Sequence, residues 1–260
     1  MKIIFNGKSV NTSVKYAHEL GEGNIIVNGY EIHSPYELKE NDKIVIYKKG
    51  EIPNKEQFAS MIGARNNIDG NVLLNAHVAI CGLGGLGSNI AVMLSRLGVG
   101  NLLLIDFDTV DITNINRQYY TLKHIGMLKT DAICDIIKDI NPYLNIKTIN
   151  IKIDENNIKE LFDGYDIICE AFDNPYAKAL LVNYVLENHP HKKLVCGSGM
   201  AGLYSSNLIQ TKRVMKNLYI CGDETNEAKI GEGLTAPRVS ICAGHEANMI
   251  LRLINGMEDV

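Results

Sequence analysis

Glycine, carboxylate, guanidinium and ammonium groups follow one another in one stretch of this chain, from Gly82 to Lys129. The stretch begins with Gly82, Gly84 and Gly87, which have the spacing G-x-G-x-x-G. Glycines at this spacing let the backbone approach phosphate groups closely. Arginine binds phosphate oxygens through parallel N–H donors, and lysine offers a compact positive charge. These residue types therefore indicate chemistry on a nucleotide that carries several phosphates.

Two predicted strands and a helix hold the glycine segment. Residues 77–81 are apolar and bounded by polar residues, which is typical of a buried parallel strand. Residues 88–97 have apolar positions at helical spacing. The next strand is predicted over 101–106 and ends at Asp106, where an acid can bind ribose hydroxyl groups. This strand–turn–helix–strand order is the context that a nucleotide-binding glycine motif requires.

The polar segment that follows this strand distinguishes ATP from a dinucleotide. It contains Asp108, Asn114, Arg117 and Gln118, and Lys129 then opens an amphipathic helix predicted over 129–140. Arginine and lysine groups here would grip a triphosphate, which a hydride-transfer enzyme does not need. A solvated, charged loop is the alternative interpretation, but the position directly after the ribose-binding strand favours the nucleotide site.

A second acidic position follows another predicted strand. Residues 165–171 predict a buried strand, and Phe172-Asp173-Asn174 stand at its carboxyl end, where open α/β sheets bind their ligands. Mg²⁺ prefers carboxylate and phosphate oxygens, so Asp173 is predicted to hold it. The alternative is that Asp173 caps a helix that starts near Pro175, and the two roles are compatible.

In this order the motifs resemble the ThiF/MoeB/HesA family, the adenylating enzymes related to ubiquitin-activating enzymes. The matching segments are GLGGLGS at 82–88, DFDTVDITNINRQ at 106–118, GMLK at 126–129 and FDN at 172–174. The resemblance runs from about residue 60 to residue 255. Within the family the chain looks most like ThiF proteins that carry an N-terminal extension similar to a sulfur-carrier domain.

The resemblance implies a role for each matched residue. Asp173 would hold Mg²⁺ and would be the residue most needed for adenylation. The family also inserts an arginine from the neighbouring subunit, and Arg65 in Ala64-Arg65-Asn66-Asn67 is the nearest equivalent, although the residues after it depart from the family's Arg-x-x-Arg-Gln. The other expected nucleotide contacts are backbone at Gly84 and Gly85, ribose at Asp106, phosphate at Asn114, Arg117 and Lys129, and further contacts at Asp108, Gln118 and Asn174.

The cysteines depart from the pattern of many family members, which bind a structural zinc through two Cys-x-x-Cys pairs. The six cysteines, at positions 81, 134, 169, 196, 221 and 242, include no such pair, so no zinc is expected. Cys221 precedes a glycine-rich, charged stretch over 222–233 that is predicted to be a flexible loop. In related enzymes such a cysteine accepts the activated carrier or sulfur, and plain burial is the alternative interpretation for Cys221.

The first fifty residues predict a small separate domain. Strand-like segments at 2–6, 24–29 and 43–48, with a short helix over 14–20, fit a β-grasp fold. The segment resembles the ThiS sulfur carrier, a ubiquitin-like protein. Such carriers end in a free Gly-Gly, whereas this chain continues past Gly50, so the segment is interpreted as a structural, docking or dimerisation module.

The expected organisation has three parts: a ThiS-like β-grasp domain over 1–50, a linker with a short helix over 51–75, and an ATP-binding adenylation domain over 76–260. The fold class of the last part is α/β, with a Rossmann-like, mixed and mainly parallel sheet. Later strands are suggested at 207–209 and 218–220, and a terminal helix at 237–255.

Composition narrows the function classes. The net charge of −4 and the pI near 6.0 argue against nucleic acid as the main partner. No apolar stretch reaches the length of a membrane span, and the start of the chain breaks too soon for a signal peptide. Six cysteines without apparent pairing fit a reducing cytoplasm, so a cytoplasmic location is expected.

The leading hypothesis is an ATP-dependent adenylyltransferase that acts on a separate ubiquitin-like sulfur carrier ending in Gly-Gly. By resemblance the context is the thiamine pathway and the enzyme is a homodimer. The alternatives have the same chemistry but a different acceptor. The acceptor would be a molybdopterin or cysteine-pathway carrier, a tRNA base, or a small or peptide carboxylate. The acidic pI argues against tRNA. An NAD-dependent oxidoreductase would leave Arg117, Lys129 and Asp173 without a role. A non-catalytic scaffold would not need Asp173.

Overall fold

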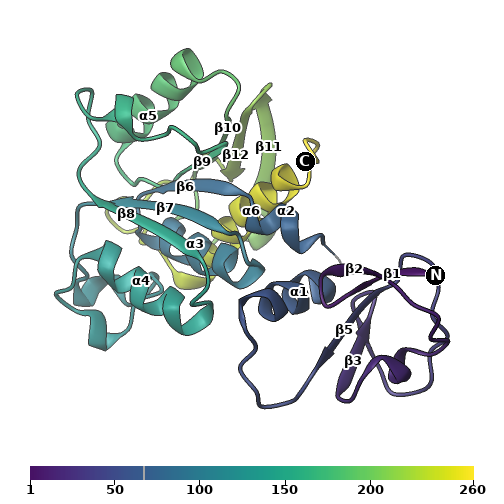
Figure 1. Cartoon of the computed structure of the whole chain (residues 1–260). Coiled ribbons are helices and arrows are strands. Elements are labelled where there is room, and N and C mark those ends of the chain that lie inside the picture. Colours follow the sequence, from purple (N-terminus) through teal and green to yellow (C-terminus); the bar gives the residue numbers. More distant parts are fainter. Residues whose placement is uncertain (67) are drawn as a thin grey trace. The chain divides into compact units, whose positions relative to one another are not determined.

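The computed structural model describes residues 1–66 and 68–260 (Figure 1). The chain forms two compact units, Met1–Asn75 and Ala76–Val260. The first unit contains both the predicted small domain and the predicted linker.

The N-terminal unit is built on a five-stranded sheet with the order β2-β1-β5-β3-β4. β1 and β5 pair in parallel, and the other neighbours are antiparallel. One face of the sheet packs its apolar side chains around Ile3, Ala17 and Ile44, which are fully buried. The elements are β1 (Lys2–Phe5), β2 (Lys8–Asn11), the 3₁₀ helix η1 (Ala17–Leu20), β3 (Asn24–Val27), β4 (Tyr30–Ile32) and β5 (Lys43–Tyr47).

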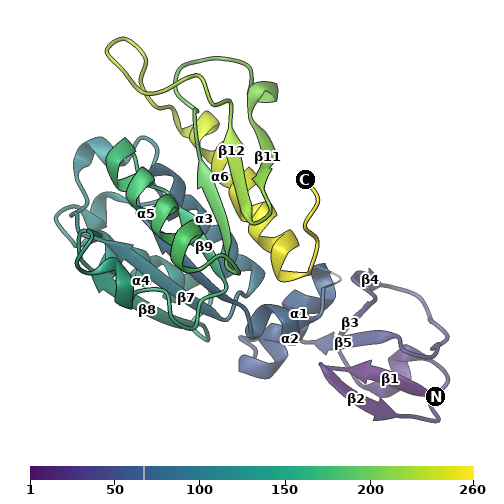
Figure 2. The same cartoon turned by 90° about the horizontal axis from the view of Figure 1, so that it is seen from above.

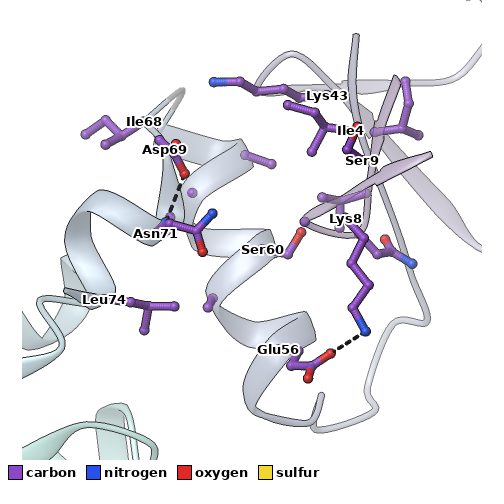
Figure 3. Close-up of a pocket in the computed structure, with 18 residues that line it drawn as sticks. Ile4, Lys8, Ser9, Lys43, Glu56, Ser60, Ile68, Asp69, Asn71 and Leu74 are labelled. Atoms are coloured by element: carbon purple, nitrogen blue, oxygen red, sulfur yellow. Dashed lines mark hydrogen bonds and ion pairs between the residues drawn. The ribbon is translucent and has the colours of Figure 1, made fainter. Parts of the chain in front are cut away.

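The other face of this sheet packs against helix α1 (Lys55–Asn66), where Ala64 and Met61 contact Ile26 and Val45. A short helix α2 (Gly70–Leu74) follows. A cavity of about 480 Å³ lies within this unit, between the two helices and strands β1, β2 and β5. Figure 3 shows the ion pair of Lys8 with Glu56 beside it, 2.9 Å long and exposed to solvent. None of the residues expected in the nucleotide site lines this cavity.

The C-terminal unit is built on a seven-stranded sheet with the order β11-β12-β10-β9-β6-β7-β8. Every neighbouring pair is parallel except β11 with β12. The strands are β6 (His77–Cys81), β7 (Asn101–Asp106), β8 (Asn145–Asn150), β9 (Ile167–Glu170), β10 (Lys193–Gly197), β11 (Gln210–Met215) and β12 (Leu218–Gly222). The mixed, mainly parallel sheet that the sequence predicted is therefore confirmed.

Helices cover both faces of this sheet (Figure 1). α3 packs against both α4 and α6 on one face, and Figure 2 shows α6 beside β11 and β12. α5 covers the other face, where Leu181 and Val185 join the core around Phe162. The helices are α3 (Gly85–Leu97), α4 (Lys129–Ile140), α5 (Pro175–Asn188) and α6 (Ala236–Ile254), with 3₁₀ turns η2 (Ile112–Asn114), η3 (Leu122–His124), η4 (Ile158–Glu160) and η5 (Ser206–Leu208).

The order of the strands reverses at β6. The chain moves from β6 to β7 and β8 on one side and then returns to β9 on the other side. In the register, Cys81 of β6 pairs with Ile105 of β7 and with Glu170 of β9. The carboxyl ends of these three strands therefore meet, and open α/β sheets bind ligands in the crevice at such a reversal.

Among the residues that the structure describes, none of the helices combines the length and the apolar character needed to span a bilayer.

Candidate functional site

The glycine turn lies at the carboxyl end of β6 and leads into α3. Gly82 has a positive φ of 93°, and a Cβ there would lie 2.8 Å from the carbonyl oxygen of Ala171. A Cβ at Gly87 would overlap the carbonyl oxygen of Gly82, so only glycine fits both positions. α3 begins at Gly85 with Gly84 as its N-cap. The first amide groups of a helix lack intrahelical partners, so the turn presents N–H donors that suit an anion.

Asp106, the last residue of β7, is fixed against this turn. Its carboxylate accepts hydrogen bonds from the backbone N–H of Leu83 at 2.6 Å and of Asp108 at 2.8 Å. The side chain is largely buried. A carboxylate has about four lone-pair sites, so acceptor capacity remains for ribose hydroxyl groups.

Lys129 and Asp108 form an ion pair at the same edge. The Lys129 ammonium group lies 2.9 Å from Asp108 Oδ2, and the Lys129 backbone N–H donates to the Asp108 carbonyl oxygen at 2.9 Å. The lysine side chain is almost fully buried, whereas that of Asp108 is about half exposed. The pair brings the first residue of α4 to the loop after β7, where its charge can interact with phosphate.

Arg117 and Gln118 pack beside the start of α3. Asn89 donates to the carbonyl oxygens of Gly85 at 2.6 Å and Arg117 at 3.2 Å, which joins the two segments. A Cβ at Gly85 would lie 3.8 Å from Arg117 Cγ, and one at Gly84 would lie 3.9 Å from Gln118 Nε2. Both side chains therefore reach the N-terminus of α3.

Asn114 plays a local structural part in this loop. Its side-chain oxygen accepts a hydrogen bond from the backbone N–H of Asp111 at 3.0 Å, and the two residues form a capping box around η2. Its amide nitrogen remains the group that could approach a phosphate.

One observation tests whether this group of residues suits a nucleotide. In the described part of the chain, three buried side-chain polar atoms lack a hydrogen-bond partner, and two of them are Arg117 Nε and Gln118 Oε1. Buried polar atoms are normally paired, so orphaned atoms indicate a place for a ligand or for water. The residues present therefore fit a phosphate-bearing group.

Asp173 follows β9 and is exposed to solvent. Across residues 1–66 and 68–260, no hydrogen bond or ion pair engages its carboxylate. The alternative that Asp173 caps α5 is wrong, because the N-cap is Asn174, whose side-chain oxygen accepts from the N–H groups of Tyr176 at 2.9 Å and Ala177 at 3.1 Å. The side-chain oxygen of Asn174 is thereby engaged in capping, and the carboxylate of Asp173 remains available to bind a ligand.

A magnesium site with a single protein carboxylate suits this arrangement. Mg²⁺ retains several waters and is commonly bound by one or two carboxylates together with substrate phosphates. No group of three or more His, Cys, Asp or Glu side chains able to hold a metal ion occurs among the described residues. A fully protein-made metal cage is thus not part of the described structure, and Asp173 would share the ion with phosphate oxygens.

Arg65 belongs to the N-terminal unit. It lies near the end of α1, is exposed, and donates to the carbonyl oxygen of Gly29 over a long distance of 3.5 Å. Asn67, the last residue of the predicted arginine segment, lies outside the described residues. Among residues 1–66 and 68–260, no ion pair engages this exposed guanidinium group.

Cys221 lies in β12 and is fully buried, between β10 and β11. Burial raises the pKa of its thiol far above the ordinary value, and Glu246 adds to the increase. The thiolate is the reactive form of cysteine, so this environment disfavours nucleophilic chemistry at Cys221.

Two features of the site had no counterpart in the sequence analysis. Tyr120 is buried, and its hydroxyl group donates to the carbonyl oxygen of Leu83 at 2.8 Å, which supports the glycine turn. Glu170 is fully buried at the end of β9 and is paired with Lys178 of α5. A carboxylate inside the apolar run 167–171 was the available signal for Glu170, because a charged residue in a buried strand needs a partner.

The fold and the site define an open α/β domain of the nucleotide-binding type, with basic groups and an exposed acid at the strand ends. A small unit built on a five-stranded sheet precedes it in the chain. Residues 60–260 match the ThiF family, and the chain belongs to that family. Residues 1–50 match the ThiS-like ubiquitin family.

Two relatives from Haemophilus influenzae illustrate the similarity. The chain is 38% identical to a tRNA threonylcarbamoyladenosine dehydratase over 151 residues, which cover 57% of this chain and 58% of that protein. It is 36% identical to a molybdopterin-synthase adenylyltransferase over 136 residues, which cover 52% of this chain and 55% of that protein. The chain thus spans little more than half the length of these curated relatives.

Solved structures share the fold. The Escherichia coli tRNA N6-threonylcarbamoyladenosine dehydratase TcdA in complex with ATP has a TM-score of 0.66 at 23% identity, covering 72% of this chain and 88% of that one. The E. coli protein MccB in complex with ATP has a TM-score of 0.57 at 19% identity, covering 80% of this chain and 73% of that one.

Proposed function

We propose that this chain is an ATP-dependent adenylyltransferase that activates the C-terminal glycine carboxylate of a separate ubiquitin-like sulfur carrier. The observation that carries the proposal is the meeting of the glycine turn, the Asp106 carboxylate and the exposed Asp173 at the carboxyl ends of β6, β7 and β9. Membership of the ThiF family supports it, as does the ATP complex of the relative TcdA.

In the proposed reaction a carboxylate oxygen of the carrier attacks the α-phosphorus of ATP. The bond from that phosphorus to the bridging oxygen of the β-phosphate breaks, and pyrophosphate leaves with the bonding electrons. An ionised carboxylate needs no general base, so the protein contributes positioning and charge neutralisation. The N-terminus of α3, Arg117 and Lys129 would neutralise phosphate oxygens. Mg²⁺ held by Asp173 would supply further neutralisation of the leaving pyrophosphate.

The ThiS-type carrier of the thiamine pathway is the proposed partner. The ThiS-like N-terminal unit supports this choice, because a ThiS-like module fused to a ThiF-type domain suggests that the two belong to the same system. We further propose that the enzyme acts in the cytoplasm as a homodimer in which the exposed Arg65 contacts the nucleotide of the neighbouring subunit.

A second candidate acceptor is a carboxyl-bearing tRNA nucleoside. The 38% identity to a tRNA threonylcarbamoyladenosine dehydratase favours it over other acceptors outside the carrier class. The chemistry on ATP would be the same, and only the attacking carboxylate would differ.

Mg²⁺-dependent exchange of labelled pyrophosphate into ATP tests the proposal. Exchange is measured with no acceptor, with a carrier ending in Gly-Gly, and with tRNA that carries threonylcarbamoyladenosine. Carrier-dependent exchange is expected, with a loss on the order of a hundredfold or more in Asp173→Ala. Asp163→Ala is the matched control, because Asp163 is an exposed acid in the loop that precedes β9, whereas Asp173 follows that strand.

The other outcomes identify the alternatives. Exchange only with the modified tRNA would assign the second acceptor. ATP binding without exchange for any acceptor would contradict the enzymatic proposal and favour a scaffold, and NAD binding in place of ATP would contradict the nucleotide assignment.

A further inference from the structure

A buried ion pair stands three residues before Asp173 in the chain, and none of the roles proposed above uses it. Glu170 is the last residue of β9 and is fully buried, and Lys178 lies in the first half of α5 with a side chain that is 29% exposed. The Lys178 ammonium group pairs with Glu170 Oε2. Burying a carboxylate is unfavourable unless it is paired and hydrogen-bonded, so this pair needs a structural or functional reason.

Each partner makes a second hydrogen bond to the backbone. Glu170 Oε1 accepts from the N–H of Phe172 at 2.8 Å, and the Lys178 ammonium group donates to the carbonyl oxygen of Gly197 at 2.7 Å. The ion pair therefore joins four parts of the molecule: the end of β9, the turn over 171–174, the helix α5 and the end of β10.

The same turn is held from its other side by the glycine segment. The Ala171 N–H donates to the carbonyl oxygen of Cys81 at 2.8 Å, and a Cβ at Gly82 would lie 2.8 Å from the Ala171 oxygen. Asn174 is fixed as the N-cap of α5. Three of the four residues in the turn are thus held by backbone or side-chain bonds, and Asp173 is the one whose exposed carboxylate makes no such bond among the described residues.

We propose that the Glu170–Lys178 ion pair is a positioning device that holds Asp173 at the nucleotide edge of the sheet. The inference rests on the proposed function, in which Asp173 binds Mg²⁺ together with ATP. Glu170 and Lys178 are positioning residues, since they act on the ion only through the turn that carries Asp173. Loss of either charge would let the turn move and would weaken the magnesium site while leaving the glycine turn in place.

The test compares Lys178→Met and Glu170→Gln with Lys192→Met. Glu170→Gln keeps the size of the side chain and an oxygen that can accept from Phe172, but it removes the charge. Lys192 is a matched control because it is also buried and donates to two carbonyl oxygens, those of Phe162 at 2.8 Å and Tyr165 at 2.6 Å, near the amino end of β9. Lys178→Arg, which keeps the charge and several donors, should restore part of any loss.

Two readouts are used, and the first needs no enzyme activity. Hydrogen exchange measured by NMR should show reduced protection of the Phe172 amide in Lys178→Met and Glu170→Gln, with no such change in Lys192→Met. The Mg²⁺ concentration that gives half-maximal pyrophosphate exchange should rise about tenfold in the first two variants, the equivalent of about 1.4 kcal/mol.

The outcomes distinguish failure of the positioning role from failure of the proposed function. Unchanged Phe172 protection and unchanged Mg²⁺ dependence in both variants would overturn the positioning role, whatever their stability. If Lys178→Met does not fold, the two measurements on Glu170→Gln alone decide whether the ion pair has the positioning role. If the wild-type protein shows no pyrophosphate exchange, the proposed function has failed, whereas the Phe172 amide still reports whether the ion pair holds the turn.

Discussion

Asp106 accepts a hydrogen bond from the backbone N–H of Leu83 at 2.6 Å, which joins the end of β7 to the turn after β6. The same carboxylate also accepts from the N–H of Asp108 at 2.8 Å. One side chain thus orders both the glycine turn and the start of the polar loop, so its proposed role as a ribose ligand and its role in building the site are linked.

Asp106→Ala should weaken ATP binding tenfold or more, because hydrogen bonds to charged groups contribute about 1.5–3 kcal/mol and two are lost. Asp106→Asn should show a smaller effect, since its amide keeps one acceptor oxygen and turns a donor toward the other N–H. Isothermal titration calorimetry with ATP measures the effect. Asp139→Ala, at an exposed acid of α4, is the control, and equal affinities of Asp106→Ala and the control would contradict this account of the site.

Gly87→Ala should lower the free energy of unfolding by about 1–3 kcal/mol, the usual range for overpacking a tight contact. The added methyl group would overlap the Gly82 carbonyl oxygen, so the glycine turn must move. Gly244→Ala is the matched control, since it lies inside α6 with no atom within 4 Å of a new Cβ. This substitution should be neutral or stabilise by about 0.5–1 kcal/mol through helix propensity. Urea denaturation of both variants compares them, and similar stabilities would show that the turn tolerates a side chain.

Among the six cysteines, Cys134 should react first with iodoacetamide in the native protein. It is only partly buried, whereas the other five are buried. Burial raises the pKa of the Cys221 thiol well above its ordinary value, so little thiolate is present at neutral pH. Peptide mass spectrometry after limited alkylation measures the order. Cys221→Ser should retain carrier-dependent sulfur transfer in a reconstituted assay, and loss of that transfer with adenylation intact would assign Cys221 a covalent role.

The thermal stability of the wild-type protein should fall as the pH rises above 4.5, the ordinary pKa of a glutamate. Glu246→Gln should make this fall smaller. Burial raises the pKa of Glu246 well above this value, and the nearby Glu170 adds to the increase. The folded protein therefore binds this proton more tightly than the unfolded chain does. The resulting stability is complete below pH 4.5 and is lost as the pH rises through the raised pKa of the folded state.

Scanning calorimetry across mildly acidic to alkaline pH follows this effect. Glutamine stays neutral throughout, so the melting temperature of Glu246→Gln should decline less steeply than that of the wild-type protein. The exposed Glu187→Gln is the control and should follow the wild-type curve. Parallel curves for all three proteins would show that Glu246 does not titrate between the folded and unfolded states as described.

Much of the central fold could be predicted because its elements have strong local patterns. The bounds predicted for β6, β7 and α4 match the structure residue for residue, at 77–81, 101–106 and 129–140. The first two are short apolar runs between polar residues, and the third has a clear helical period. The glycine spacing further specified the turn between β6 and α3.

Elements with weak patterns were missed or misplaced. β2 and β4 are short and largely exposed, although the Asn6-Gly7 and Asn28-Gly29 pairs before them, all with positive φ, are a hairpin signal. The strand predicted at 207–209 was wrong, because η5 occupies Ser206–Leu208 and β11 begins at Gln210. β8 lies at the edge of its sheet and alternates too irregularly to be recognised.

The site itself depends on strand order, which local sequence does not encode. Asp173 stands beside the glycine turn because β9 pairs with β6. Along the chain, the strands β7 and β8 and the helices α3 and α4 lie between β6 and β9. The Glu170–Lys178 pair arises from the same pairing and from the position of α5. Residue types identified the candidate ligands, and the tertiary arrangement decides which of them can act together.

The parallel pairing of β1 with β5 also constrains how the N-terminal unit folds. Ile4 pairs with Lys43 and Phe5 with Ile44, so the centre of this sheet joins segments at opposite ends of the small domain. Contacts between distant segments require loop closure before they gain energy, which slows folding. β5 lies between the β1–β2 and β3–β4 hairpins in the sheet and is synthesised after both of them. A stable sheet can therefore form only after β5 has been made, and this unit is expected to fold in one cooperative step at that point.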